Sequence, residues 1–379
     1  MSTSQPDGHG AIPLLQWPEG DRHAYELACL PGSPFDEGGQ AAKWRPATHK
    51  ALMGTYARWL GFLVGEDCDL AMESPPDRVT RERMDRYRWF LIKRCASETV
   101  SSYLGQLHMM LRDVWPAYDW AWLCDMQARQ HRMAEPSRHK EIRVVAQQDL
   151  LQLGLDLMRR ATLMPIWDGM PAGPHHPALI FRDGFMIALL ALRPLRQRNF
   201  LGLQLGRHLR EEDDTWEITI PATETKNHSR LVQPFPQMLV SALKAYLTIY
   251  RPHLLGLRGP AHPNHRVVPA GAHLWVTRCG SAMTPGALQK ALQRHTTKRF
   301  GHVVNCHLFR DCVATSIANE DPEHFSVAAC LLGHHSVQTT HANYVAADRR
   351  AALRCSQTIV VSRRKAAKRK PPCIRGKRS

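Results

Sequence analysis

Hydrophobic residues recur at helical spacing along most of the chain, and the first long run of this kind covers residues 44–65 (WRPATHKALMGTYARWLGFLVG). The same spacing predicts three further helices, two of which start at a candidate capping residue: 80–94 (Thr80), 97–115 (Ser97) and 119–130. Residues 1–40 are rich in glycine and proline and carry little periodicity, so a poorly ordered N-terminal extension is expected there. The block of residues 41–132 is therefore predicted to be all-helical.

A polar, basic stretch at residues 133–145 predicts a linker to a second block, residues 146–356, in which helical and alternating patterns are mixed. Helical spacing covers 146–162, 181–193, 195–205 and, from Thr284 and Pro285 onward, most of the chain to about 356. Short strands are predicted at 216–220 (WEITI), at its partner 230–235 (RLVQPF) across a turn at 225–229, and within 273–283. The patterns together predict a mainly α fold with a small antiparallel β-sheet.

The chain is strongly basic, with 50 Lys and Arg against 34 Asp and Glu and a formal net charge of +16. The segment 357–379 is predicted to be a basic C-terminal tail, because nine Lys and Arg and no acidic residue lie within 363–379. Subtracting nine from +16 leaves +7 on the rest of the chain. A charge of this sign favours a polyanion such as nucleic acid as partner.

The sequence excludes several classes of protein. No uninterrupted apolar stretch is long enough for a membrane span and no secretory signal is visible in the first residues, so neither a membrane protein nor an exported protein is expected. The 10 cysteines form no C-x-x-C pair, so neither a zinc ribbon nor a thioredoxin-type redox motif is supported. A cytoplasmic protein with reduced cysteines is expected.

Chemically versatile side chains are concentrated near the end of the second block. His307 and Arg310 are three residues apart on a predicted helix and therefore project from the same face. Gly333 predicts a helix end that places His334 at a turn, and Tyr344 follows on the next predicted helix. Arginine binds phosphate oxygens in a forked geometry, histidine transfers protons, and tyrosine offers a nucleophilic hydroxyl, so the set suits phosphate chemistry.

Two alternatives remain for these residues. Four histidines could form a zinc site, although no H-E-x-x-H or paired Cys/His spacing supports it: His307, His334, His335 and His341. Tyr344 could also be an ordinary packing residue of an amphipathic helix.

In this region the chain resembles the tyrosine recombinase (phage integrase) family, whose signature reads H-x-x-R, then L-G-H, then a tyrosine on the next helix. The matching segments are HLFR (307–310), LLGH (331–334) and TTHANY (339–344). The family's first arginine lies in a turn between two helices, which RPLRQRN matches with Arg196, and its lysine lies on a β-hairpin, which ETKNHSR matches with Lys226.

The chain departs from the family pattern at several positions. Asn199 stands where the family usually has an acid, and Asp311 follows Arg310 where a second histidine is frequent. Arg193 and Arg198 are alternatives to Arg196 as the first arginine, which is preferred because a Pro-Leu pair precedes it.

The resemblance implies that Tyr344 attacks a DNA phosphodiester and forms a 3′-phosphotyrosyl link, while Arg196 and Arg310 hold the phosphate oxygens. It further implies that Lys226 protonates the leaving 5′-oxygen and that His307 accepts the proton of the tyrosine.

His334 would donate a hydrogen bond to the phosphate. No metal and no other cofactor is expected, because the arginines and the lysine supply the positive charge.

On the same resemblance, residues 41–132 form a helical core-binding domain and residues 146–356 a catalytic domain. The expected partner is double-stranded DNA carrying a recombination site, bound by a homotetramer, in the cytoplasm near the nucleoid. Two other functions remain: a type IB topoisomerase-like relaxase, and a catalytically inactive DNA-binding regulator of the same fold.

Overall fold

A computed structural model of the chain describes residues 10–134, 140–167, 170, 173–213, 215–256 and 270–320. The chain divides into two units between His139 and Lys140, which lies inside the stretch 133–145 that was expected to be a linker. Each unit has its own hydrophobic core. No helix within the described ranges combines the length and the hydrophobicity that a membrane span requires.

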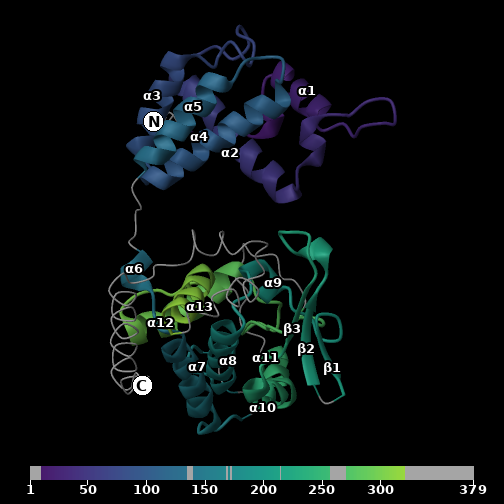
Figure 1. The fold of residues 1–379 in the computed structure, drawn as a ribbon, viewed down its shortest axis with the longest axis vertical. Coiled ribbons are helices and arrows are strands. Elements are labelled where there is room, and N and C mark those ends of the chain that lie inside the picture. The colour runs from purple at the N-terminus through teal and green to yellow at the C-terminus, as the bar shows by residue number, and fades with distance from the viewer. Residues whose placement is uncertain are drawn as a thin grey trace, which may run out of the picture. The chain divides into compact units, whose positions relative to one another are not determined.

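The regular elements in the described residues of unit 1 are helices, joined by turns and loops, apart from one isolated bridge between Ser33 and Asp36 (Figure 1). In chain order its elements are η1 (Leu14–Gln16), α1 (Glu19–Ala28), η2 (Gln40–Lys43), α2 (Pro46–Gly65), α3 (Arg81–Ile92), α4 (Ser97–Val114) and α5 (Ala121–Met133). Helix α4 packs against α2 and α5, and its fully buried face includes Leu104 and Leu107. The four helices predicted from hydrophobic spacing are thus confirmed.

Of the two capping residues predicted in unit 1, one is confirmed. The side chain of Thr80 accepts a hydrogen bond from Arg83 N at 3.2 Å and caps α3. The prediction for Ser97 is wrong, because α4 already begins at this residue and its N-cap is Ala96, which makes no side-chain bond.

The prediction of a poorly ordered extension is wrong for residues 10–40. Helix α1 lies in this stretch, and Tyr25 is buried in the core of unit 1. Asp21 makes a buried ion pair with Arg78, with 2.9 Å between Oδ1 and Nη1. The glycines and prolines lie mostly in the turns around a helix of 10 residues. The average composition of the stretch therefore did not reveal the helix or the buried contacts of Tyr25 and Asp21. Residues 1–9 lie outside the described part of the chain.

In unit 2 the three strands lie together at one edge, beside the helices (Figure 1). Its helices are α6 (Lys140–Arg143), α7 (Gln147–Thr162), α8 (Pro177–Leu192), α9 (Gln197–Leu201), η3 (Ala222–Glu224), η4 (Gln237–Leu239), α10 (Val240–Ala245), the π-helical turn η5 (Tyr246–Tyr250), α11 (Arg251–Gly256), α12 (Pro285–Phe300) and α13 (Cys306–Glu320). Its strands are β1 (Leu209–Glu212), β2 (Thr215–Ile220) and β3 (Leu231–Pro234).

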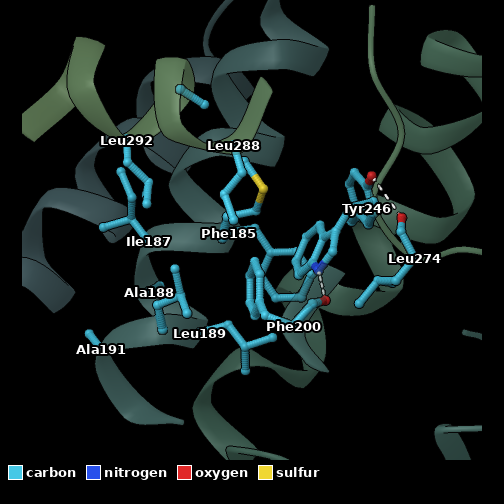
Figure 2. Close-up of a cluster of buried hydrophobic side chains, with 14 of the residues drawn as sticks. Phe185, Ile187, Ala188, Leu189, Ala191, Phe200, Tyr246, Leu274, Leu288 and Leu292 are labelled. Carbon is cyan, nitrogen blue, oxygen red and sulfur yellow. Dashed lines mark hydrogen bonds between the residues drawn. The ribbon is translucent and has the colours of Figure 1, made fainter. Parts of the chain in front are cut away.

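Helix α8 is the centre of unit 2, because every residue from Pro177 to Ala191 is buried. Figure 2 shows Phe185 of α8 among the hydrophobic side chains of the other elements. The hydroxyl of Tyr246 donates to Leu274 O at 3.0 Å, so this buried polar group is satisfied inside the core.

The three strands form one antiparallel sheet in the order β1-β2-β3. The predicted pairing of residues 216–220 with 230–235 is confirmed, and Ile220 lies opposite Leu231. Strand β1 was missed, because LREE is short and half acidic. The strand predicted within 273–283 is reduced to isolated bridges such as Val276 with Ala282.

One helical prediction in unit 2 needs adjustment, and the predicted start of another helix is confirmed. The helix predicted at 195–205 is shortened to α9. Helix α12 begins as expected, with Pro285 in its first turn and the Thr284 side chain accepting from Ala287 N at 3.2 Å. Beyond α13 the predicted helical region to about 356 lies outside the described residues. The architecture, mainly α with a small antiparallel sheet, is the one that the sequence predicts.

Candidate active site

A sharp turn between α8 and α9 carries Arg196. Helix α8 ends at Leu192, one residue before Arg193 and two before Pro194, which lacks the N–H needed to continue a helix. Leu195 is 3% exposed and fixes the turn to the core. Arg196 is the N-cap residue of α9 and is half-buried. The backbone of Arg196 is therefore fixed by the buried Leu195 before it and by helix α9 after it.

Lys226 lies in the loop between β2 and β3 and is exposed. The hydroxyl of Thr225, which is 6% exposed, donates to Ser229 O at 2.9 Å and accepts from Ser229 N at 3.1 Å. His228 adopts a left-handed backbone conformation with a φ of 52° and lets the chain reverse within the loop. These contacts close the five-residue turn that contains the lysine.

Two hydrogen bonds join the α8–α9 turn to this loop. Arg196 Nη2 donates to Asn227 Oδ1 at 3.4 Å, which is a long bond. Asn199 Nδ2 donates to Glu224 O at 3.1 Å. The two contacts lie on either side of Lys226 in the sequence, so the first turn of α9 holds the loop before and after the lysine.

Helix α13 approaches the same turn from another direction. Asn305 Oδ1 accepts from Leu308 N at 2.9 Å at the start of this helix. One turn further, Arg310 is 4% exposed, and its Nη1 donates to Pro194 O at 2.5 Å across 116 positions of sequence. His307 lies on the same helix and is exposed.

The structure thus brings three of the predicted segments together around the α8–α9 turn: the turn with Arg196, the loop with Lys226, and the helix with Arg310. His307 lies on α13, three residues before Arg310, with an exposed side chain. His334 and Tyr344 lie outside the described residues, so the predictions made for them stay predictions.

The structure also separates the three candidates for the first arginine. Arg193 donates to Pro234 O at 3.0 Å and to Leu192 O at 2.9 Å, and burial lowers its pKa from the usual arginine value. Arg198 is exposed. Arg196 is the candidate whose guanidinium reaches the lysine-bearing loop.

The residues that connect these segments were not predicted from the sequence. Asn199 stands out there only as a departure from the family's acid, and Asn227 belongs to no motif. One signal was available for Asn199, because an amide can donate to a carbonyl and an ionised carboxylate cannot. The partner of that donor, Glu224 O, is 25 positions away, so only the folded chain shows it.

Among the described residues, no group of three or more His, Cys, Asp or Glu side chains is placed to hold a metal ion. Of the four histidines in the alternative zinc cluster, His307 is described, and the other three lie outside these ranges.

Comparison with solved structures identifies the fold. The XerH site-specific recombinase bound to difH substrate, in a pre-cleavage complex, matches with a TM-score of 0.50 and 14% identity over 78% of this chain and 75% of that chain. The XerH post-cleavage complex with palindromic difH substrate has a TM-score of 0.47 and 14% identity, covering 78% of this chain and 74% of that one.

The XerA recombinase has a TM-score of 0.38 and 16% identity, covering 88% and 96%. No family model and no curated protein sequence matches the chain. The fold assignment rests on the pre-cleavage complex together with the helical first unit, the three-stranded sheet and the order of the motifs. The chain has the tyrosine recombinase fold.

Proposed function

We propose that the chain is a tyrosine recombinase that exchanges DNA strands at specific sites through a 3′-phosphotyrosyl intermediate. The observation that carries this proposal is the hydrogen bond from Arg310 to Pro194 O, together with the contacts of Arg196 and Asn199 to the Lys226 loop. They gather two arginines and a lysine-bearing loop from three distant segments, as a site for phosphoryl transfer requires.

Tyr344 is the nucleophile in this proposal. Its oxygen forms a bond to the scissile phosphorus while the bond from phosphorus to the 5′-oxygen breaks. His307 takes the tyrosine proton, and Lys226 gives a proton to the leaving oxygen. A free tyrosine has a pKa near ~10, so its hydroxyl needs help to lose a proton at neutral pH. The phosphotyrosyl link conserves the bond energy, and a second 5′-hydroxyl reverses the step without ATP.

Arg196 and Arg310 stabilise the charge that develops on the phosphoryl oxygens, and His334 donates a further hydrogen bond. The burial of Arg310 and its anchor on Pro194 O suit this role, since donors fixed in advance in a partly dry site cost little reorganisation during the reaction. Fixed guanidinium groups also supply the positive charge that divalent metals supply at other phosphoryl-transfer sites.

The proposed partner is double-stranded DNA that carries a recombination site, and the proposed assembly on it is a homotetramer in the cytoplasm near the nucleoid. The net charge of +16 supports a polyanionic partner. Among the solved structures, the matching XerH chains are complexes with a difH substrate.

A covalent selection tests the proposal and identifies the target sequence in the same experiment. The full chain is incubated with a pool of nicked duplexes of randomised sequence, and DNA that stays attached after denaturation is sequenced. We expect attachment to converge on a defined sequence and to be lost in Tyr344→Phe, which keeps the ring for DNA binding. Equal trapping by Tyr344→Phe would refute the role of the tyrosine.

Two other outcomes separate the alternatives. Attachment without sequence convergence would favour a type IB topoisomerase-like relaxase. DNA binding with no covalent product would favour an inactive regulator of the same fold.

A further inference from the structure

The loop that carries Lys226 is held mainly by groups that belong to neither strand. On its N-terminal side, the carboxylate of Glu224 lies against two residues near the start of β1. Arg207 forms an ion pair with this carboxylate. The side chain of His208 is 3% exposed, and its Nε2 lies 3.1 Å from Glu224 Oε2, although the angle between the groups does not suit a hydrogen bond. The Glu224 carbonyl faces a different element and accepts the amide of Asn199.

The contact of Asn199 is the best placed of these to control the lysine. Asn199 is 9% exposed, so water competes little for its bond to Glu224 O. It lies three residues after Arg196, one turn of α9 further along. A single short helix therefore carries an arginine of the proposed site and the donor that fixes the loop opposite.

The chemistry of the donor is specific. Glu224 O is a carbonyl and can only accept, so its partner must carry a hydrogen. An amide supplies one at every pH, whereas a carboxyl group supplies one only when protonated. The contact therefore requires a side chain that can donate, as asparagine does, whereas an ionised acid would place a negative charge against the carbonyl oxygen.

We propose that Asn199 is a positioning residue whose hydrogen bond to Glu224 O sets the location of the Lys226 loop relative to Arg196. The inference rests on the proposed function, in which Lys226 protonates the leaving 5′-oxygen. Without the bond, the loop keeps its internal turn around Thr225 but loses its fixed position relative to α9. Proton transfer to the leaving group then slows, while the arginine contacts to the phosphate persist.

The principal variant is Asn199→Leu, which keeps the number and the branching of the side-chain heavy atoms and removes the donor. The matched control is Thr284→Val, an isosteric change in the same unit that removes one side-chain hydrogen bond at the start of α12. Each variant loses one hydrogen bond between a side chain and the backbone, worth about 1 kcal/mol, so a general loss of stability is expected in both.

The first measurement is hydrogen–deuterium exchange of the full chain without DNA. We expect the amides of residues 222–230 to exchange faster in Asn199→Leu and at the wild-type rate in Thr284→Val. Wild-type protection of this loop in Asn199→Leu would overturn the inference, whatever the protein does to DNA.

The second measurement compares two DNA substrates from the covalent selection, one with the normal 5′-oxygen at the scissile phosphate and one with sulfur in its place. A thiolate leaves without a proton, so cleavage of the sulfur substrate needs no acid. We expect Asn199→Leu to be slower on the oxygen substrate by about 10–100-fold, as a misplaced catalytic group implies, and to match wild type on the sulfur substrate. Lys226→Ala gives the reference behaviour.

An equal defect of Asn199→Leu on both substrates would overturn the inference, because the fault would then not concern protonation. A third variant, Asn199→Asp, adds a pH readout: its rate relative to wild type should rise as the pH falls and the carboxyl gains a hydrogen to donate. A ratio independent of pH would contradict the requirement for a donor.

Failure of the proposed function has a different signature. If the covalent selection yields no DNA attached to the wild-type protein while the loop exchanges faster in Asn199→Leu, the proposed function is refuted and the coupling of Asn199 to the loop is supported.

Discussion

Replacement of Arg310 by lysine tests the part of the site that joins α13 to the α8–α9 turn. Nη1 of Arg310 donates to Pro194 O at 2.5 Å, and the residue is 4% exposed. Lysine retains the positive charge but lacks the planar fork that can hold a carbonyl and a phosphate oxygen in fixed directions. We therefore expect Arg310→Lys to lower both the stability of unit 2 and the rate of covalent attachment.

The two losses have different sizes. A hydrogen bond to a charged group is worth about 1.5–3 kcal/mol, which limits the fall in the free energy of unfolding. A domain with the usual ~5–15 kcal/mol of stability stays folded after that loss. Removal of one fixed donor from a developing oxyanion slows the reaction by about 10²–10³. The loss of rate therefore exceeds what unfolding explains.

Arg182→Lys is the matched control. Arg182 is also buried in unit 2, and its Nη1 donates to Val276 O at 2.7 Å, but it lies on α8 beside Asp183 and outside the proposed site. Urea denaturation should show both variants destabilised, and single-turnover attachment to the selected nicked duplex should be slowed only in Arg310→Lys. A wild-type rate for folded Arg310→Lys would reduce Arg310 to a structural link and refute its catalytic role.

Three further predictions concern the rest of the chain. Deletion of residues 363–379 should weaken DNA binding and flatten its salt dependence, since each phosphate contact contributes about 0.9 to the slope of log K against log salt; an unchanged slope in a salt titration would show that the tail does not contact DNA. Gly184→Ala should lower the free energy of unfolding by about 1–3 kcal/mol, because its Cβ would lie 2.7 Å from a backbone oxygen of α7. Gly286→Ala should raise the free energy of unfolding by about 0.5–1 kcal/mol, because no atom lies within 4 Å of the added carbon. If urea denaturation changed the stability of both variants in the same direction, the packing described here would be contradicted. Burial alone would raise the pKa of Asp183, but the charge of Arg182 and a hydrogen bond from a histidine of α12 lower this pKa overall. The ionised Asp183 therefore contributes its full stabilisation at a pH above its pKa in the unfolded chain, about 3.9. That stabilisation is lost as the pH falls through the lower pKa of the folded protein. Asp183→Asn should show a smaller loss of stability than wild type over that acid range, and an equal loss would contradict the prediction.

The sequence alone predicted the elements whose signal is local. Hydrophobic spacing located the helices that became α2 and α8, and the predicted end of the latter at residue 193 lies one residue beyond the observed end at Leu192. The spacing of His307 and Arg310 placed both on one helix, which the structure confirms as α13.

The features that the sequence did not predict depend on contacts between distant segments. The anchoring of residues 10–40 rests on single side chains such as Tyr25 and Asp21, which no periodicity reveals. The bond of Asn199 to Glu224 O likewise joins elements that are adjacent only after folding.

The most direct test of the account is to identify the residue that holds the DNA. Wild-type protein is trapped on the selected nicked duplex, digested with protease and nuclease, and the linked peptide is sequenced by mass spectrometry. We expect a nucleotide attached through its 3′-phosphate to the oxygen of Tyr344. Attachment to any other residue, or through a 5′-phosphate, would contradict this expectation.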